Sequence, residues 1–182
     1  MLLLVGVLLG IIIGFAARGQ LMRLTMLRGL WLPILSFAVM PALRIFPAMP
    51  LWIKAVIMIF SYGCILLFAY QNKKFWLPAL LISAGSLMNF AVIAANAFRM
   101  PVSERALSVY ADMTPEAVIA KHADYFVACG DKARLLFLGD VIYVPVPVVG
   151  GFLSLGDIVL ALGVGILIVM SMAEAPNKEK SQ

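Results

Sequence analysis

Charged residues are scarce in this chain, and histidine and cysteine are almost absent. Only 13% of the 182 residues are Asp, Glu, Lys or Arg, whereas 64% are hydrophobic. The mean hydropathy of +1.05 describes far more apolar surface than a water-soluble globule of this length can bury. The composition therefore excludes a soluble fold and predicts a helical membrane protein.

The single histidine and the two cysteines do not indicate a metal or cofactor site. His122 is the only histidine, and it has no second His, Cys or clustered acid at ligand spacing, so we expect no metal and no cofactor. Cys64 lies in an apolar run and Cys129 in a polar segment, so a disulfide between them is not expected. The net charge of +5 does not indicate nucleic acid, because half of the basic residues flank apolar runs, as orientation in a bilayer requires.

Five apolar segments are candidates for crossing a bilayer core of about 30 Å at about 1.5 Å per residue. We expect an all-α polytopic membrane protein, a single membrane domain over residues 1–182, with a helical loop at the outer face over 99–154. Glycines every fourth residue in the first segment allow close helix packing, and two prolines are expected to kink the second. The glycines are Gly6, Gly10 and Gly14, the prolines are Pro33 and Pro41, and the segments are 2–17, 30–46, 51–70, 75–98 and 155–172.

Basic residues set the expected orientation in the membrane. The first segment has no basic residues ahead of it, and no small-residue cleavage site lies before the arginines that follow it, so we expect a retained segment with its N-terminus outside. Placing the basic connections on the cytoplasmic side predicts a multi-pass cell-membrane protein with a cytoplasmic C-terminus. These residues are Arg18, Arg23, Arg28, Lys73, Lys74, Lys178 and Lys180.

Residues 99 to 132 form the one long polar stretch. Thr114, Pro115 and Glu116 provide an N-cap, a first-turn proline and a first-turn acid, which predict a helix from there to about Ala128. Residues 103–111 are expected to form another short helix on the membrane surface.

The fourth segment places Ser86, Asn89 and Asn96 on one side of a helix. Amides at such positions face a partner within the protein and not lipid. An interhelical hydrogen bond is favoured over a substrate contact, because buried amides usually serve packing. Both interpretations remain open.

Two carboxylates, Asp140 and Asp157, each follow glycine and precede a β-branched residue beside apolar segments, where an ionised group is costly. In a structural interpretation Ser154 is the N-cap of the last helix and Asp157 its third residue, an acid that complements the helix dipole. Asp140 then lies in a turn, where Arg44 or Arg134 could pair with it.

In a catalytic interpretation the two carboxylates meet at the outer membrane boundary. They share one proton, because like charges at close range cannot both ionise. One acts as a base on water while the other donates to a carbonyl oxygen.

The residues around the pair, from Gly130 through Arg134 to Ile142 and from Phe152 to Gly163, resemble the two aspartate motifs of the lipoprotein signal peptidase family. The resemblance implies that Asp140 and Asp157 match that family's catalytic dyad and Arg134 its nearby arginine. Asp131 and Ser154 stand where the motifs have asparagine, and that family has four crossings. The whole chain, through Met88, Asn89, Asn96 and 100–102, resembles an uncharacterised bacterial membrane family of unknown function, which implies no activity.

The favoured hypothesis is an intramembrane aspartic hydrolase acting on a peptide or lipopeptide at the outer face. Asp140 and Asp157 are its catalytic candidates, and Asn89, Asn96, Arg134 and Ser154 its substrate-binding candidates. The alternative is a non-enzymatic membrane subunit or small-ligand binding protein, with these groups in a polar pocket or facing a membrane protein partner. Membrane lipid is an expected partner in both. A proton-coupled transporter is weaker, because no inverted repeat is evident.

Overall fold

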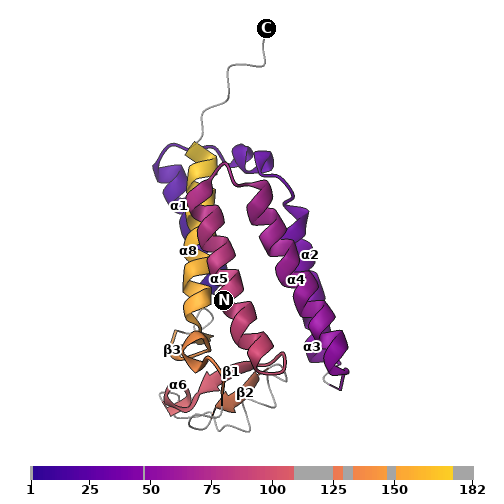
Figure 1. Ribbon diagram of the computed structural model, residues 1–182. Helices are drawn as coiled ribbons and strands as arrows, with labels where there is room; N and C mark the ends of the chain where they lie inside the picture. Colours follow the sequence, from indigo (N-terminus) through magenta and orange to yellow (C-terminus); the bar gives the residue numbers. More distant parts are fainter. Residues whose placement is uncertain (1, 47, 109–124, 129–132, 147–150, 174–182) are drawn as a thin grey trace.

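A computed structural model describes residues 2–46, 48–108, 125–128, 133–146 and 151–173. The protein is mostly helical, and three of its helices are long and apolar enough to cross a membrane. Shorter apolar helical segments, α1 (Leu2–Ala16) and Trp31–Leu43, run beside them (Figure 1). The three long helices are α4 (Leu51–Gln71), α5 (Trp76–Ala95) and α8 (Leu155–Ala173).

The second predicted segment is divided into α2 (Trp31–Val39) and α3 (Pro41–Ile45). The division falls at Pro41, because proline has no amide hydrogen for the helical ladder and its ring clashes with the preceding turn. This confirms the expected interruption there. Helix α2 continues through Pro33, its third residue, where an amide hydrogen has no partner within a helix in any case.

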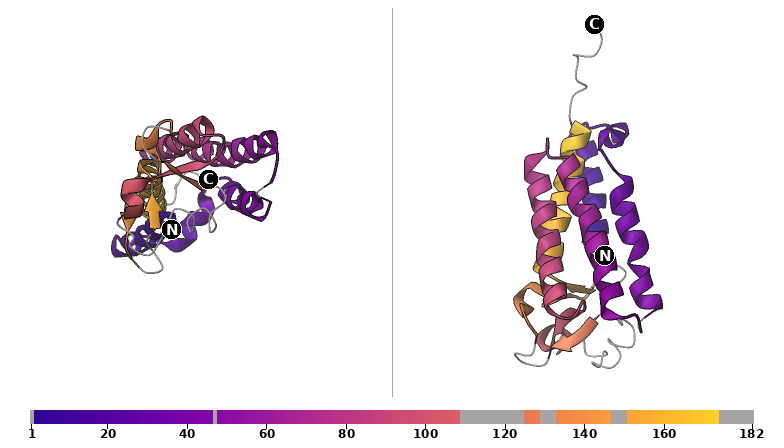
Figure 2. Two further views of the ribbon diagram at one scale, coloured as in Figure 1. Left: turned by 90° about the horizontal axis from the view of Figure 1, so that it is seen from below. Right: turned by 45° about the vertical axis from the view of Figure 1, so that its right-hand side comes forward.

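The helices follow one another in a row. Helix α8 packs between α1 and α5, and α4 packs between α5 and α2. Seen along the helix axes the row is bent (Figure 2), so that α1 and α2 lie on opposite sides of an apolar groove. A short 3-10 helix, η1 (Leu21–Met26), connects these two ends of the row.

Glycine explains the close approach of α1 to α8. A Cβ added at Gly6 would lie 2.6 Å from the Ala161 carbonyl oxygen, and one at Gly10 would lie 2.8 Å from that of Gly165. Gly14 instead faces the flexible end of the Met172 side chain, which can move aside. A side chain at Gly6 or Gly10 would meet backbone and force the helices apart, which confirms the predicted packing role of the glycine face.

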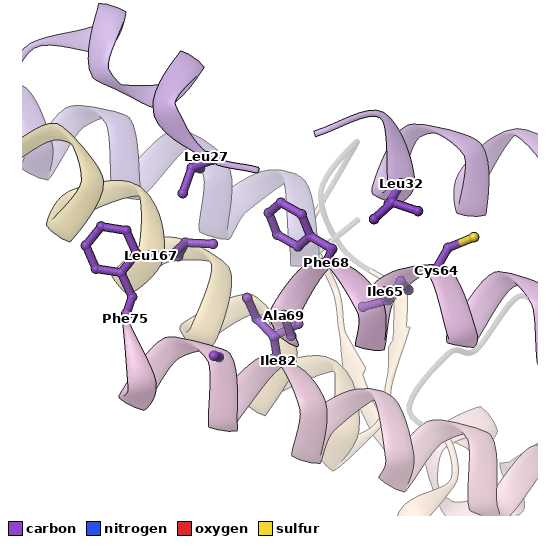
Figure 3. Packing of buried hydrophobic residues seen from close by; sticks show 10 residues of the cluster. Leu27, Leu32, Cys64, Ile65, Phe68, Ala69, Phe75, Ile82 and Leu167 are labelled. Atoms are coloured by element: carbon purple, nitrogen blue, oxygen red, sulfur yellow. The ribbon is translucent and has the colours of Figure 1, made fainter. Parts of the chain in front are cut away.

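The core between the helices is apolar with isolated polar pairs. Cys64, a free thiol, is buried in it, while Cys129 and His122 lie outside the described residues. The Ser36 and Ser61 hydroxyls share a 2.7 Å hydrogen bond between α2 and α4. Figure 3 shows the surrounding cluster: Leu27, Leu32, Cys64, Ile65, Phe68, Ala69, Phe75, Ala79, Ile82 and Leu167.

Short strands lie at one end of the helices (Figure 1), which the expected all-α class did not include. Strand β1 (Met100–Ser103) pairs in parallel with β2 (Tyr125–Ala128), and β3 (Ile142–Val144) pairs antiparallel with β4 (Gly151–Leu153). We call this part of the molecule the strand end. The prediction of a helix reaching about Ala128 is wrong for Tyr125–Ala128, because this aromatic and β-branched run suits a strand and finds β1 as its partner. Residues 109–124 lie outside the described residues.

The other predicted short helix is present as α6 (Glu104–Ser108). The Ser103 hydroxyl accepts a hydrogen bond from the Ala106 amide at 3.1 Å, which satisfies one of the amides left free at a helix start. The predicted helix is therefore confirmed over Glu104–Ser108, Ser103 belongs to β1, and the location of the helix on the membrane surface stays a prediction.

Candidate functional site

Asp157 lies in the first turn of α8 and forms a reciprocal cap with Ser154. The Asp157 amide donates to the Ser154 hydroxyl at 3.0 Å, and the Ser154 amide donates to Asp157 Oδ2 at 3.2 Å. Two amides without helical partners are satisfied in this way, and the carboxylate complements the positive end of the helix dipole. The structural interpretation of this Ser-x-x-Asp sequence is confirmed.

Asn89 joins this cap to α5. Its amide nitrogen donates to Asp157 Oδ1 at 2.7 Å, and its amide oxygen accepts from the Ser154 hydroxyl at 2.8 Å. Asn89 and Ser154 are both buried, so these bonds form in a medium of low dielectric, where they are strong. The interhelical hydrogen bond favoured for Asn89 is confirmed, and its partner is one of the two candidate carboxylates.

Asp140 is fixed by its backbone beside β1. Its amide donates to the Pro101 carbonyl at 2.9 Å, and its carbonyl accepts from the Ser103 amide at 3.1 Å. The 3-10 helix η3 (Leu136–Leu138) leads into it through Gly139. Only 1% of Asp140 is exposed. Burying an ionised carboxylate costs free energy unless it is paired or hydrogen-bonded.

Tyr62 of α4 relates the two carboxylates. The charges of Asp157 and Asp140 both influence its hydroxyl, so Tyr62 lies near both, and its ring packs on Phe90 with a centroid distance of 5.5 Å. Asp157, Asn89 and Ser154 are joined by hydrogen bonds, and Tyr62 and Asp140 lie in the same region of the molecule. We call these five residues the carboxylate cluster.

Asn96 and Arg134 are joined through the backbone. The Asn96 side chain donates to the Arg134 carbonyl at 2.7 Å and accepts from the Arg134 amide at 3.0 Å, and it also donates to the Val92 carbonyl. Asn96 is the C-cap of α5, which ends at Ala95 and not at Phe98 as expected. These bonds give Asn96 a role in placing the segment that precedes Asp140, while the Arg134 side chain is exposed.

Residues that follow Asn96 and Arg134 have left-handed backbone conformations. Ala97 and Phe98 have φ of 54° and 58°, and Leu135 has φ of 54°. Such values cost an L-residue about 1–2 kcal/mol each, so the surrounding contacts must impose them. Strain of this kind often occurs where a site is positioned.

Ala97→Gly is expected to stabilise the protein by about 1 kcal/mol, because Ala97 follows the C-cap of α5, where glycine adopts positive φ without strain. This corresponds to a rise of about 2–4 °C in the unfolding midpoint, measured on the purified protein in detergent. The matched control is Ala95→Gly, inside the helix, which should lower the midpoint. A lower midpoint for both variants would contradict the left-handed conformation.

An apolar groove adjoins the carboxylate cluster. It has a volume of about 590 Å³ and lies between α1, α8 and the β3–β4 hairpin, so we call it the hairpin groove. Ile142 lies two residues after Asp140, Leu153 precedes Ser154, and Ile158 follows Asp157; all three line this groove. The groove is therefore lined by residues close to the two carboxylates in sequence, while Asp140 and Asp157 themselves are not part of its lining.

Sequence reasoning identified four members of the carboxylate cluster and missed Tyr62. Nothing in the apolar run around Tyr62 distinguishes it from an ordinary core aromatic, since its relation to the carboxylates arises from packing of α4. Ser86, on the face shared with Asn89, is buried, and its hydroxyl has no hydrogen-bond partner among the described residues. Within that same part of the chain, no three His, Cys, Asp or Glu side chains lie close enough to hold a metal.

The fold and cluster define a mostly helical protein with membrane-spanning character and buried carboxylates at one end. The chain belongs to a family of unknown function (DUF5317), which matches residues 24–169. No curated protein matches it, and no solved structure does. The match covers the carboxylate cluster, α4, α5 and most of α8, and it confirms the resemblance to an uncharacterised family.

Proposed function

We propose that this protein is an intramembrane aspartic hydrolase that cleaves a lipopeptide, or a related peptide, at the outer face of the cell membrane. The observation that carries the proposal is that two carboxylates, the enclosed Asp140 and the hydrogen-bonded Asp157, lie at the same end of the molecule and near Tyr62. Paired acidic groups in buried surroundings are common in active sites.

The roles follow from the surroundings of each carboxylate. Asp157 accepts hydrogen bonds from Asn89 and from the Ser154 amide, which hold its carboxyl group in place to take a proton from water. Asp140, enclosed and almost unexposed, would supply the proton to the carbonyl oxygen of the scissile amide. Water then attacks the carbonyl carbon. As the C–N bond breaks, the proton on Asp157 passes to the leaving amine and Asp140 regains its proton.

The hairpin groove supports a lipid-modified substrate. All of its lining residues are apolar, from Leu2 on α1 to Val169 on α8, so it offers an acyl chain a continuous apolar surface. The peptide part of the substrate would extend from the groove toward the carboxylates, whose near neighbours in sequence, Ile142 and Ile158, line it. Peptide positioning would then fall to the cluster and to the segment that Asn96 and Arg134 hold.

The proposed orientation has five helical crossings, with the N-terminus and the strand end outside and the C-terminus in the cytoplasm. Supporting this, the connections at the opposite end carry Arg18, Arg23, Arg28, Lys73 and Lys74, and basic residues favour the cytoplasmic side. Helices α1 and α2–α3 would cross beside the three long helices.

A non-enzymatic membrane subunit or binding protein is the second candidate. It is favoured by one observation: the hydrogen bonds of Asp157 serve the cap of α8 and the contact with α5, so stability alone can explain this residue. A membrane protein partner or small ligand would then contact the carboxylate cluster.

Cleavage of synthetic substrates tests the proposal. The purified protein in nanodiscs would be incubated with a pool of apolar peptides, each supplied with and without a diacyl-modified cysteine, and the products identified by mass spectrometry. We expect cleavage of the lipid-modified members and none by the double variant Asp140→Asn/Asp157→Asn. If the wild-type protein and the double variant give the same products, the protein is not an aspartic hydrolase.

A further inference from the structure

Two basic connections, distant in sequence, are held together by Asn72 at the end opposite the strands. Asn72, at the C-terminus of α4, is 1% exposed. Its side-chain oxygen accepts from the Arg28 amide at 3.0 Å, and its nitrogen donates to the Arg28 carbonyl at 2.9 Å. The exposed side chains of Arg28 and Lys73 are therefore carried by segments that are fixed to each other.

At this end of the molecule, every charged residue that the structure describes is basic. The acids within the described part of the chain are Glu104, Asp140 and Asp157, and all three belong to the strand end. Arg28 and Lys73 are accompanied here by Arg18, Arg23 and Lys74. Of these, Arg23 donates to the Met172 carbonyl at the end of α8. A surface with this balance attracts an anion.

An apolar groove begins beside Arg28 and runs along the inside of the bent row of helices. It has a volume of about 380 Å³, within the range of about 300–1,000 Å³ typical of ligand sites. We call it the inner groove. Leu24, Leu27 and Leu30 line it around Arg28, and Phe68 lines it one turn before Asn72; Figure 3 shows Leu27 and Phe68 with Ile82 and Leu167, which line it further along.

The length of the inner groove suits an acyl chain. Its lining on α8 extends from Ile168 to Leu160, which is about 12 Å at about 1.5 Å per residue. It therefore runs from the basic surface toward the middle of the helices, between α1 and α2.

We propose that the inner groove is a binding site for an anionic phospholipid, with one acyl chain in the groove and the phosphate group against Arg28 and Lys73. A basic rim at the mouth of an apolar groove matches both parts of such a lipid. Asn72 provides the geometry, because it holds the two basic connections at a fixed separation. The site lies at the opposite end from the carboxylate cluster and does not depend on hydrolysis.

The first test is a lipid titration of the full chain purified in a nonionic detergent. Dioctanoyl phosphatidylglycerol should raise the unfolding midpoint in a saturable way, dioctanoyl phosphatidylcholine should bind more weakly, and glycerol phosphate should have no effect. Arg28→Gln and Lys73→Gln should each weaken binding of phosphatidylglycerol about fivefold. Lys54→Gln, on α4 near the strand end, is the matched charge control and should leave binding unchanged.

The second test fills the groove without changing charge. Ile34 lines the inner groove on α2 and is 69% exposed, and Ile59 on α4 is 57% exposed and lies outside it. Both tolerate a larger side chain, so both variants should fold. Ile34→Trp should weaken binding by at least about fivefold, and Ile59→Trp should not. Equal binding of the two lipids, stabilisation by glycerol phosphate, or equal effects of the two tryptophan variants would overturn the proposal.

Discussion

Asp140→Asn is expected to abolish hydrolysis while the protein remains folded. Asparagine has nearly the same shape as aspartate, and the backbone bonds of residue 140 to Pro101 and Ser103 do not involve its side chain. In the proposed mechanism the variant lacks the group that would donate a proton to the substrate carbonyl, and loss of an acid or base typically lowers kcat by about 10²–10⁴-fold. The measurements are kcat on the cleaved lipopeptide and the unfolding midpoint.

Ser154→Ala is the control that separates catalysis from packing. It removes the hydrogen bonds to Asn89 and to the Asp157 amide but keeps both carboxylates. It should lower stability by about 1 kcal/mol, as expected for a lost N-cap, and reduce kcat much less than Asp140→Asn. An Asp140→Asn variant with wild-type kcat would rule out the dyad.

The parts of the site that were predictable are those with local signals. Ser154 and Asp157 are three residues apart, which is the spacing of a reciprocal cap, so no knowledge of the tertiary structure was needed to relate them. Asn89 lies on an apolar helix, where a buried amide must find a partner. Sequence could say that a partner existed, but its identity as Asp157 depends on how α5 and α8 are aligned.

The parts that were missed depend on contacts between distant segments. Tyr62 approaches the two carboxylates only because α4 packs on α5. Strand β2 was predicted as the end of a helix because Thr114 to Glu116 carry a strong start signal, whereas nothing nearby marks Tyr125–Ala128 as a partner of β1. Whether such a segment forms a strand depends on the strand with which it pairs.

Asn72 and Asn96 make the same pattern of hydrogen bonds at opposite ends of the molecule. Each is the C-cap of a long helix, each donates to the carbonyl four residues before it, and each binds both backbone groups of a distant arginine. Asn96 fixes the segment leading to Asp140, and Asn72 fixes the basic surface. Sequence alone shows only an asparagine after an apolar run, because the bound backbone lies 38 or 44 residues away.

Gly156→Ala is expected to have the largest effect on stability of any single methyl addition at the carboxylate cluster. A Cβ at Gly156 would collide with the side-chain oxygen of Asn89 and would lie 2.8 Å from the Gly85 carbonyl oxygen. Asn89 cannot turn away without losing its bonds to Asp157 and Ser154, so α8 must move from α5. Overpacking of this kind costs about 1–3 kcal/mol, and the broken bond to a charged partner adds about 1.5–3 kcal/mol.

Two glycine variants serve as controls for Gly156→Ala. For each variant, stability is measured as the unfolding midpoint in detergent and activity as kcat on the lipopeptide. Gly163→Ala also crowds α5, with its Cβ 2.8 Å from the Ile82 amide nitrogen, but it lies two turns from Asp157, so it should lower stability and leave kcat largely unchanged. Gly63→Ala on α4 meets nothing within 4 Å and should be neutral or stabilising. Gly156→Ala should lose both stability and activity. If it behaved like Gly63→Ala, then α5 and α8 would not approach closely enough for Asn89 to hold Asp157, and the carboxylate cluster would lose its positioning group.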